Sequence, residues 1–162
     1  MTSNLAQFTT FTIERHFSHD PAAVFSAWSS AEARAKWFAG GSEVKQEQRE
    51  LDFRVGGREQ LRCVWNSGTI SHFDSRFFDI VNNQRIVYAY DMYIDQKKLS
   101  VSLSTVEFMP AKDGCLMKYT EQCAFLDGYA DNGSREHGSR QLIEQLADSL
   151  AGSAQKNLAN CH

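Results

Sequence analysis

Two charged side chains lie among apolar residues in segments that alternate like strands, and they are the first candidates for chemistry. Glu121 lies on the apolar face of segment 115–125, and Arg15 lies on the apolar face of segment 8–17. Alternate residues of a strand point to the same side, and a charge on an apolar face is costly unless it is paired. We therefore expect each of them to contact a partner or a ligand. The residues that share these faces are Cys115, Met117, Tyr119, Cys123 and Phe125 with Glu121, and Phe11, Ile13 and Phe17 with Arg15.

The histidines offer the next candidates. His72 shares the strand parity of Phe78 and Ile80 if that strand has no bulge, and His137 lies in the first turns of a C-terminal helix. A Ser/His/Asp or Cys/His set needs partners that the sequence does not place. We predict no catalytic residue and consider each histidine as part of a cavity wall or as a structural or surface residue.

The four cysteines are Cys63, Cys115, Cys123 and Cys161, and they form no metal-binding pattern. There is no C-x-x-C pair and no histidine at ligand spacing. The Gly56-Gly57 pair lacks the strand-to-helix context of a phosphate-binding loop and predicts a turn. The sequence therefore predicts reduced thiols, no metal and no cofactor.

Aromatic residues make up 12% of the chain, with 11 Phe, 5 Tyr and 3 Trp. That is more than a small core requires, so some of them are expected to line a cavity for a small ligand, with core packing as the alternative. The indole and hydroxyl groups among them need hydrogen-bond partners when buried, which a ligand's oxygens can supply. The aromatic candidates for the cavity wall are Trp28, Trp37, Phe38, Phe53, Trp65, Tyr88, Tyr90 and Phe125.

The order of elements is a strand, two short helices, six strands and a long helix. The first strand covers 8–17. The two short helices are capped by Asp20 and Ser30 and run from Pro21 to about Trp28 and from Ala31 to Phe38. Short turns then separate strands that form an antiparallel meander, at about 42–55, 57–65, 69–81, 85–94, 98–108 and 115–125. A long amphipathic helix follows, ending at Gly152.

The chain length and the charge limit the class of protein. The 162 residues predict one domain over 8–152, with tails at 1–7 and 153–162. A net charge of −3 argues against a nucleic-acid partner. Neither a secretory signal nor an apolar stretch of about 18 residues is visible, so we expect a cytoplasmic protein without membrane insertion.

Three segments carry a resemblance to a known family: FTIERHFSHDPAAVFSAWSSAEARAKWF, LDFRVGG and YTEQCAFLDGYADNGSREHGSRQLIEQLADSL. Together they resemble the SRPBCC (START-like) superfamily, and within it the branch named for the activator homologues of heat-shock protein 90 ATPase. The resemblance covers about residues 8–151. It implies an α+β helix-grip (Bet v-like) fold, in which a curved seven-stranded antiparallel sheet wraps around the C-terminal helix and encloses a hydrophobic cavity.

In the topology that this resemblance implies, the first and last strands are antiparallel neighbours. If Phe11 lies opposite Phe125, then Arg15 lies opposite Glu121, and we predict an ion pair between them. The pair would either close the sheet or orient a ligand. An adjacent arginine lowers the pKa of a glutamate, which counts against a role in acid–base catalysis.

The preferred interpretation is a protein that binds a small hydrophobic or aromatic molecule between the long helix and the sheet. Arg15, Glu121, Tyr90 and Trp65 are the expected polar contacts. One alternative is an enzyme on the same cavity, such as a cyclase, a dehydratase or a hydrolase. Another is a protein-interaction module, which would show an exposed apolar patch on the outer face of the sheet. A homodimer is compatible with the sequence.

Overall fold

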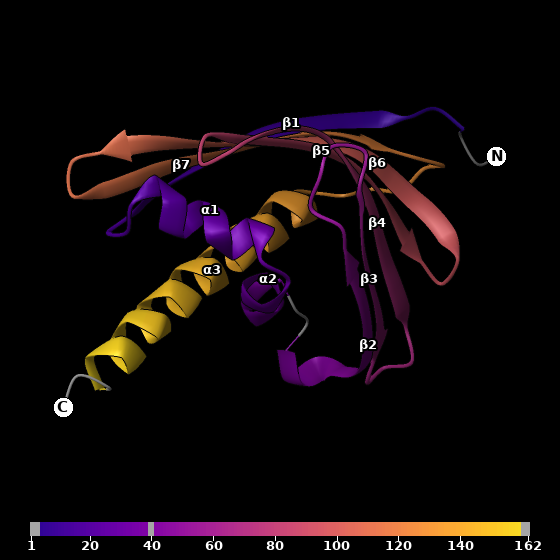
Figure 1. Cartoon of the computed structure of the whole chain (residues 1–162). Helices are drawn as coiled ribbons and strands as arrows, with labels where there is room; N and C mark the ends of the chain where they lie inside the picture. The colour runs from indigo at the N-terminus through magenta and orange to yellow at the C-terminus, as the bar shows by residue number, and fades with distance from the viewer. Residues whose placement is uncertain (1–3, 39–40, 160–162) are drawn as a thin grey trace.

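The fold is an antiparallel sheet that curves over three helices. The computed structural model describes residues 4–38 and 41–159, and side chains as far as residue 152. The seven strands lie in the order β1-β7-β6-β5-β4-β3-β2, and Figure 1 shows α1, α2 and α3 together on the concave side. The expected α+β helix-grip fold is confirmed. The elements are β1 (Gln7–Phe17), α1 (Pro21–Ser29), α2 (Ala31–Trp37), a 3-10 turn (Gly41–Glu43), β2 (Val44–Leu51), β3 (Arg58–Trp65), β4 (Ile70–Val81), β5 (Arg85–Ile94), β6 (Lys97–Ala111), β7 (Gly114–Phe125) and α3 (Ser134–Ala159).

The two short helices begin where their capping residues predict. Asp20 accepts a hydrogen bond from the amide of Ala23 at 2.8 Å, and Pro21 occupies the start of α1. Ser30 accepts one from the amide of Ala33 at 3.3 Å and caps α2. Each cap satisfies an amide that has no partner within its own helix.

The predicted end of the long helix is wrong. α3 continues through Gly152 to Ala159. Gly152 does not have the positive φ that a helix-ending glycine adopts. A glycine weakens a helix but breaks it only where the backbone leaves the right-handed region.

Side chains alternate between a buried concave face and an exposed convex face. On β7, every second residue from Cys115 to Phe125 is buried. On β4, the register shifts between Phe77 and Asp79, so Ile80 packs against the core whereas Phe78 is exposed. Because of this bulge, Ile80 does not share a face with the even-numbered residues earlier in β4.

The pairing of β1 with β7 differs from the prediction by four residues. Phe11 lies opposite Glu121, and Arg15 lies opposite Met117. A shift of four keeps every side chain on its predicted face, because strand faces alternate with a period of two. The predicted Arg15–Glu121 ion pair is absent, and each of these residues has a different partner.

The two edges of the sheet are β1 and β2. Six of the eight residues of β2 are exposed. The strand carries alternating charges, including an ion pair of 3.0 Å between Arg49 Nη2 and Glu47 Oε2. Charged side chains on a short edge strand are typical of soluble sheets.

The turn between β2 and β3 provides a test of the fold. Gly56 has a φ of +82°, and a Cβ on Gly57 would lie 2.0 Å from the carbonyl oxygen of Asp52. We expect Gly57→Ala to lower the free energy of unfolding by about 1–3 kcal/mol, because the backbone has to move to relieve the clash. Urea denaturation measures the effect, and Val55→Ala in the same exposed turn should change stability by less than about 0.5 kcal/mol. Equal stability of both variants would contradict this account of the turn.

Candidate functional site

A cavity of about 350 Å³ lies between the concave face of the sheet and the helices α2 and α3. The volume is at the lower end of the range of about 300–1,000 Å³ that is typical of small-molecule sites. Apolar and aromatic side chains provide most of its wall. The lining residues are Trp28, Arg34, Trp37, Phe38, Leu61, Cys63, Trp65, Ser71, Phe73, Tyr88, Tyr90, Met92, Tyr119, Tyr129, Asp131, Ser134, Arg135, Gly138, Ser139, Leu142 and Ile143.

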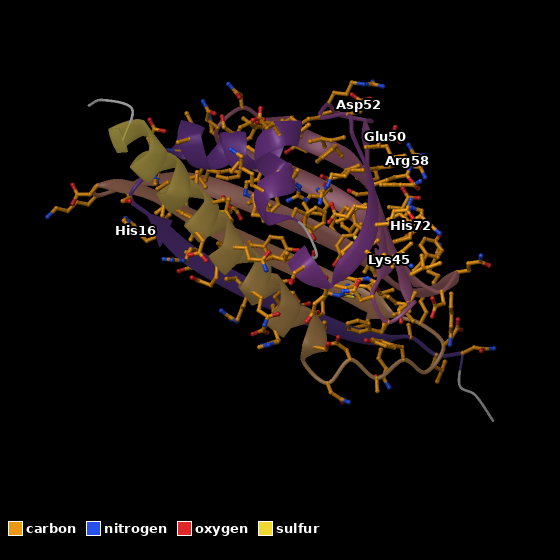
Figure 2. The ribbon with its side chains drawn as sticks, turned by 90° about the horizontal axis from the view of Figure 1, so that it is seen from below. His16, Lys45, Glu50, Asp52, Arg58 and His72 are labelled. Atoms are coloured by element: carbon orange, nitrogen blue, oxygen red, sulfur yellow. The ribbon has the colours of Figure 1, made fainter. Side chains whose placement is uncertain are left out.

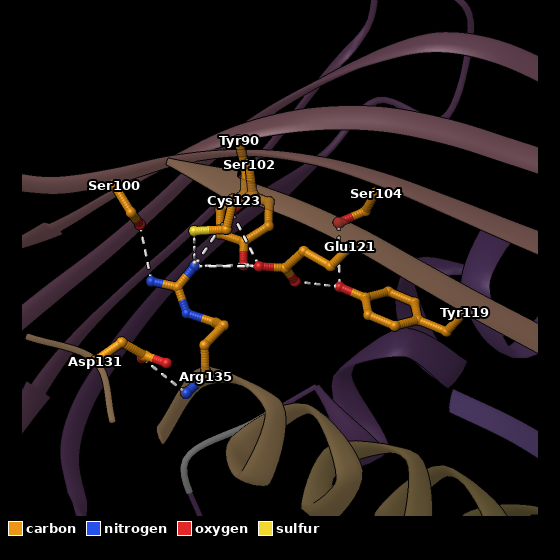
Figure 3. A network of polar contacts seen from close by, with 9 residues as sticks. All are labelled: Tyr90, Ser100, Ser102, Ser104, Tyr119, Glu121, Cys123, Asp131 and Arg135. Carbon is orange, nitrogen blue, oxygen red and sulfur yellow. Dashed lines mark hydrogen bonds and ion pairs between the residues drawn. The ribbon is translucent and has the colours of Figure 1, made fainter. Parts of the chain in front are cut away.

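A buried carboxylate lies behind this cavity. Glu121 is completely buried, and Figure 3 shows it surrounded by hydrogen-bond donors. Its Oε2 accepts hydrogen bonds from Tyr90 Oη at 2.8 Å and Ser102 Oγ at 2.9 Å, and its Oε1 accepts one from Tyr119 Oη at 2.6 Å. The ion-pair partner of Glu121 is Arg135, whose Nη1 lies 3.2 Å from Oε2.

Arg135 joins the first turn of α3 to the middle of the sheet. Its Nη2 donates to Ser100 Oγ at 2.8 Å, and its side chain is 15% exposed. Its backbone amide donates to Asp131 Oδ1 at 2.9 Å, just ahead of the helix. The guanidinium therefore reaches the small serine side chains of β6 while it borders the cavity (Figure 3).

Sequence reasoning did not identify Arg135. The sequence indicates that Glu121 needs a cation, but the predicted pairing takes that cation from the first strand and not from the helix. The loop of residues 126–133 between β7 and α3 determines which residue of the helix reaches Glu121. No periodicity in the sequence predicts the conformation of that loop.

A second buried ion pair supports the aromatic wall on α2. Arg34 donates to Glu59 of β3 through Nε at 2.9 Å and through Nη2 at 2.8 Å. Its side chain is 4% exposed. Its guanidinium carbon lies 4.8, 4.6 and 3.9 Å from the ring centres of Trp28, Trp37 and Phe38. This arrangement combines a bidentate ion pair with cation–π contacts and holds three lining residues in place.

Two donors on this wall have no hydrogen-bond partner in the described part of the chain. They are Nε1 of Trp28 and Nη1 of Arg34, both buried. The corresponding indole of Trp37 donates to the carbonyl of Ala27 at 2.9 Å. The wall thus has an excess of donors over acceptors.

Burial shifts the pKa values of the groups around the cavity. It raises the pKa of Tyr88 to about 12 and raises the pKa values of Tyr90 and Tyr119 well above their ordinary values. Burial also raises the pKa of the Cys63 thiol. Burial alone would lower the pKa of Arg34, but the Glu59 carboxylate outweighs this effect and raises it. These tyrosines and this thiol stay protonated at neutral pH.

Six of the predicted cavity residues line the cavity: Trp28, Trp37, Phe38, Trp65, Tyr88 and Tyr90. The polar tips of two of them contact protein groups, since Trp65 Nε1 donates to Ser71 Oγ at 2.8 Å and Tyr90 donates to Glu121. Glu121 itself lies behind the lining. The six lining residues lie on or directly after the short helices and on strands β3 and β5.

Two further aromatic candidates pack away from the cavity. Phe53 contacts the rings of Phe25 and Phe77, at 5.7 and 5.0 Å between ring centres. Phe125 contacts Tyr129 at 5.6 Å, at the far end of β7. Phe53 packs against the hydrophobic core, Phe125 is buried beside the lining residues Tyr129 and Arg135, and neither lines the cavity itself.

The predicted positions of Arg15, His72 and His137 in the cavity wall are wrong. Arg15 pairs with Glu144 of α3, with 3.0 Å between Nε and Oε1 and both side chains partly exposed. His72 lies on the convex face, as Figure 2 shows, and its Nε2 is 2.9 Å from Gln60 Oε1. His137 lies on an exposed face of α3. Strand parity placed His72 with Ile80, and the bulge in β4 reverses that relation.

The convex face carries a small apolar patch. Phe8, Val101 and Leu103 are 80%, 40% and 42% exposed. Ala124 of β7 lies opposite both Phe8 and Val101, whereas the next outward pair, Thr10 and Gln122, is polar. The patch therefore lies over the start of β1 and the first half of β6.

The described residues 4–38 and 41–159 contain no group of three or more His, Cys, Asp or Glu side chains that could hold a metal ion. Within the same ranges, no helix combines the length and the apolar character needed to cross a membrane.

The fold and the cavity define the class of protein, a helix-grip domain with an internal ligand-sized cavity. The family model described as "Activator of Hsp90 ATPase homolog 1-like protein" matches residues 18–153. The chain belongs to this family, within the SRPBCC superfamily that the sequence resembles. No curated protein matches the chain.

Solved structures agree with this assignment. A protein from Rhizobium leguminosarum is 41% identical, with 91% of this chain and 97% of that chain covered and a TM-score of 0.87. The Mll3558 protein from Rhizobium loti is 40% identical, with 90% and 99% covered and a TM-score of 0.83. The CV1439 protein from Chromobacterium violaceum is 25% identical, with 87% and 96% covered and a TM-score of 0.72.

The corrected pairing of Glu121 gives a testable difference between two glutamates. We expect Glu121→Gln to lower the free energy of unfolding by about 3–5 kcal/mol, because it leaves the buried Arg135 guanidinium without its counter-charge. Glu144→Gln, which removes the exposed partner of Arg15, should cost no more than about 1 kcal/mol. Chemical denaturation of both variants measures these values. Similar losses would contradict the assignment of Glu121 as the buried partner.

The buried tyrosines predict a loss of stability at alkaline pH. Their pKa values are raised in the folded state, so folding is favoured most below about pH 10, the ordinary tyrosine pKa. This contribution falls as the pH rises through 10 toward 12 and above. Absorbance at the tyrosinate band, followed together with circular dichroism, should show that Tyr88 ionises only near pH 12 or on unfolding. Tyr90 and Tyr119 should likewise ionise only well above the ordinary tyrosine pKa or on unfolding. Ionisation of all tyrosines near pH 10 with the fold intact would contradict their burial.

Proposed function

We propose that the protein binds a small, uncharged, largely aromatic or apolar molecule in the cavity between α3 and the sheet. The observation that carries this proposal is a cavity of about 350 Å³ whose wall is mostly apolar and aromatic and whose two arginines are paired within the protein. Burial of apolar ligand surface would supply most of the affinity, at about 25 cal/mol per Å² before the cost of association.

The charges at the cavity favour a neutral ligand. Arg34 is paired with Glu59 and Arg135 with Glu121, so neither guanidinium lacks a counter-ion. Asp131 adds a further acidic group at the N-terminal end of α3. An anionic ligand would have to compete with a carboxylate that is already in place, whereas a neutral ligand leaves both ion pairs intact.

The unpaired donors favour a ligand that carries an oxygen acceptor. Trp28 Nε1 and Arg34 Nη1 have no hydrogen-bond partner among the described residues, whereas the oxygens of Glu59 and Glu121 accept hydrogen bonds from the protein. A carbonyl or ether oxygen would satisfy a donor that is otherwise buried at a cost. One such acceptor on an apolar body would fix the orientation of the ligand.

Binding explains the cavity better than catalysis does. A nucleophile or a general acid–base group needs a pKa near the working pH, but burial raises the pKa values of Cys63 and of the lining tyrosines away from neutrality. The buried carboxylates of Glu59 and Glu121 are held by arginines, and the lining Asp131 accepts a hydrogen bond from the backbone amide of Arg135. An enzyme on this scaffold would need a reactive group supplied by its substrate.

A pair of fluorescent probes with the same aromatic body tests the proposal. N-phenyl-1-naphthylamine is neutral, and 8-anilinonaphthalene-1-sulfonate carries an added sulfonate. We expect the neutral probe to bind one site with a micromolar Kd and the sulfonate to bind at least about tenfold more weakly, because its charge has no free counter-ion. Probe fluorescence and quenching of the tryptophans measure both values.

Two matched variants locate the binding. Met92 lines the cavity, whereas Met109 lies on β6 with its side chain on the opposite face. We expect Met92→Trp to abolish binding of the neutral probe and Met109→Trp to leave it unchanged. Absence of saturable binding to the wild type, together with native mass spectrometry of freshly purified protein that shows no extra mass, would overturn the proposed function.

A further inference from the structure

Gly138 lies in the cavity wall on α3, at a position where the fold does not require glycine. Its φ is not positive, and a Cβ built on it would meet no heavy atom of the described residues within 4 Å. A tight contact of this helix with the sheet therefore does not explain the residue. Glycine is also among the least favourable residues inside a helix.

The neighbours of Gly138 on α3 show what its missing side chain leaves open. One turn before it, Arg135 borders the polar end of the cavity, and one turn after it Leu142 borders the apolar part. Residues three and four apart lie on the same face of a helix. Ser134 and Ser139 are the other small residues that α3 contributes to the wall. Large apolar side chains such as Ile143 and Leu146 continue the face beyond it and are buried.

We propose that Gly138 is a specificity-determining residue, which keeps the cavity wide enough for a ligand ring to lie against the backbone of α3 beside Arg135. This inference rests on the proposed function and adds the position that sets the width of the site. A methyl group at residue 138 would project into the cavity without touching protein. The helix is therefore less stable than it could be, and the volume gained is available to the ligand.

The test separates helix stability from binding by using a second glycine of the same helix. Gly152 also lacks a positive φ, and a Cβ there meets no heavy atom of the described residues within 4 Å, but it lies outside the cavity. Gly138→Ala should raise the melting temperature by about 2–4 °C, as expected for a better helix former in a domain of this size. Gly152→Ala should raise the melting temperature by up to the same amount.

Binding of N-phenyl-1-naphthylamine then distinguishes the two positions. We expect Gly138→Ala to raise the Kd at least about tenfold and Gly138→Leu to abolish binding, because the added atoms occupy space in the cavity that the ligand needs. Gly152→Ala should bind the probe like the wild type. The alanine variant keeps the test valid if the leucine variant does not fold.

The outcomes separate this inference from the proposed function. If the wild type binds the probe and Gly138→Ala binds it equally well, the role of Gly138 is wrong while the cavity remains a binding site. If the melting temperature of Gly138→Ala falls, the glycine serves the fold and the inference is also wrong. If the wild type does not bind, both proposals fail.

Discussion

The buried carboxylate of Glu121 is the constraint on which the architecture of the site depends. A charge that is completely buried in the middle of a sheet must be neutralised, and the guanidinium of Arg135 does this from the first turn of α3. The ion pair fixes the N-terminal end of the helix over β6 and β7. The long arginine side chain reaches from α3 to Ser100 of β6 and borders the cavity along its length.

The Arg34–Glu59 pair holds the other wall in a comparable way. It joins α2 to β3, and its guanidinium packs against the rings of Trp28, Trp37 and Phe38. Aromatic side chains without such a frame would collapse into a cavity of this size, because an empty apolar space forfeits dispersion contacts. Two buried ion pairs, one from α2 and one from α3, therefore support the cavity wall, at the cost of desolvating four charged groups.

The sequence was sufficient to predict the elements and the faces of the strands, but not the register or the partners of the charged residues. Period-two alternation places Glu121 and Arg15 on the concave face, yet registers that differ by four residues satisfy the same alternation. The bulge in β4 and the loop before α3 are backbone conformations with no periodic signal, and they determine where His72 and Arg135 point. The aromatic wall was predictable because helix caps and strand parity suffice to place Trp28, Trp37 and Tyr90.

The exposed strand β2 affects how copies of the protein can associate through their sheets. The sheet is open, and a free strand edge presents unpaired backbone groups that can template growth into a larger sheet or an aggregate. The exposed side chains of β2 carry alternating charges, such as those of the Glu47–Arg49 pair. An incoming strand would remove water from these charges and would bring its own side chains against them. Edge-to-edge pairing through β2 is therefore disfavoured.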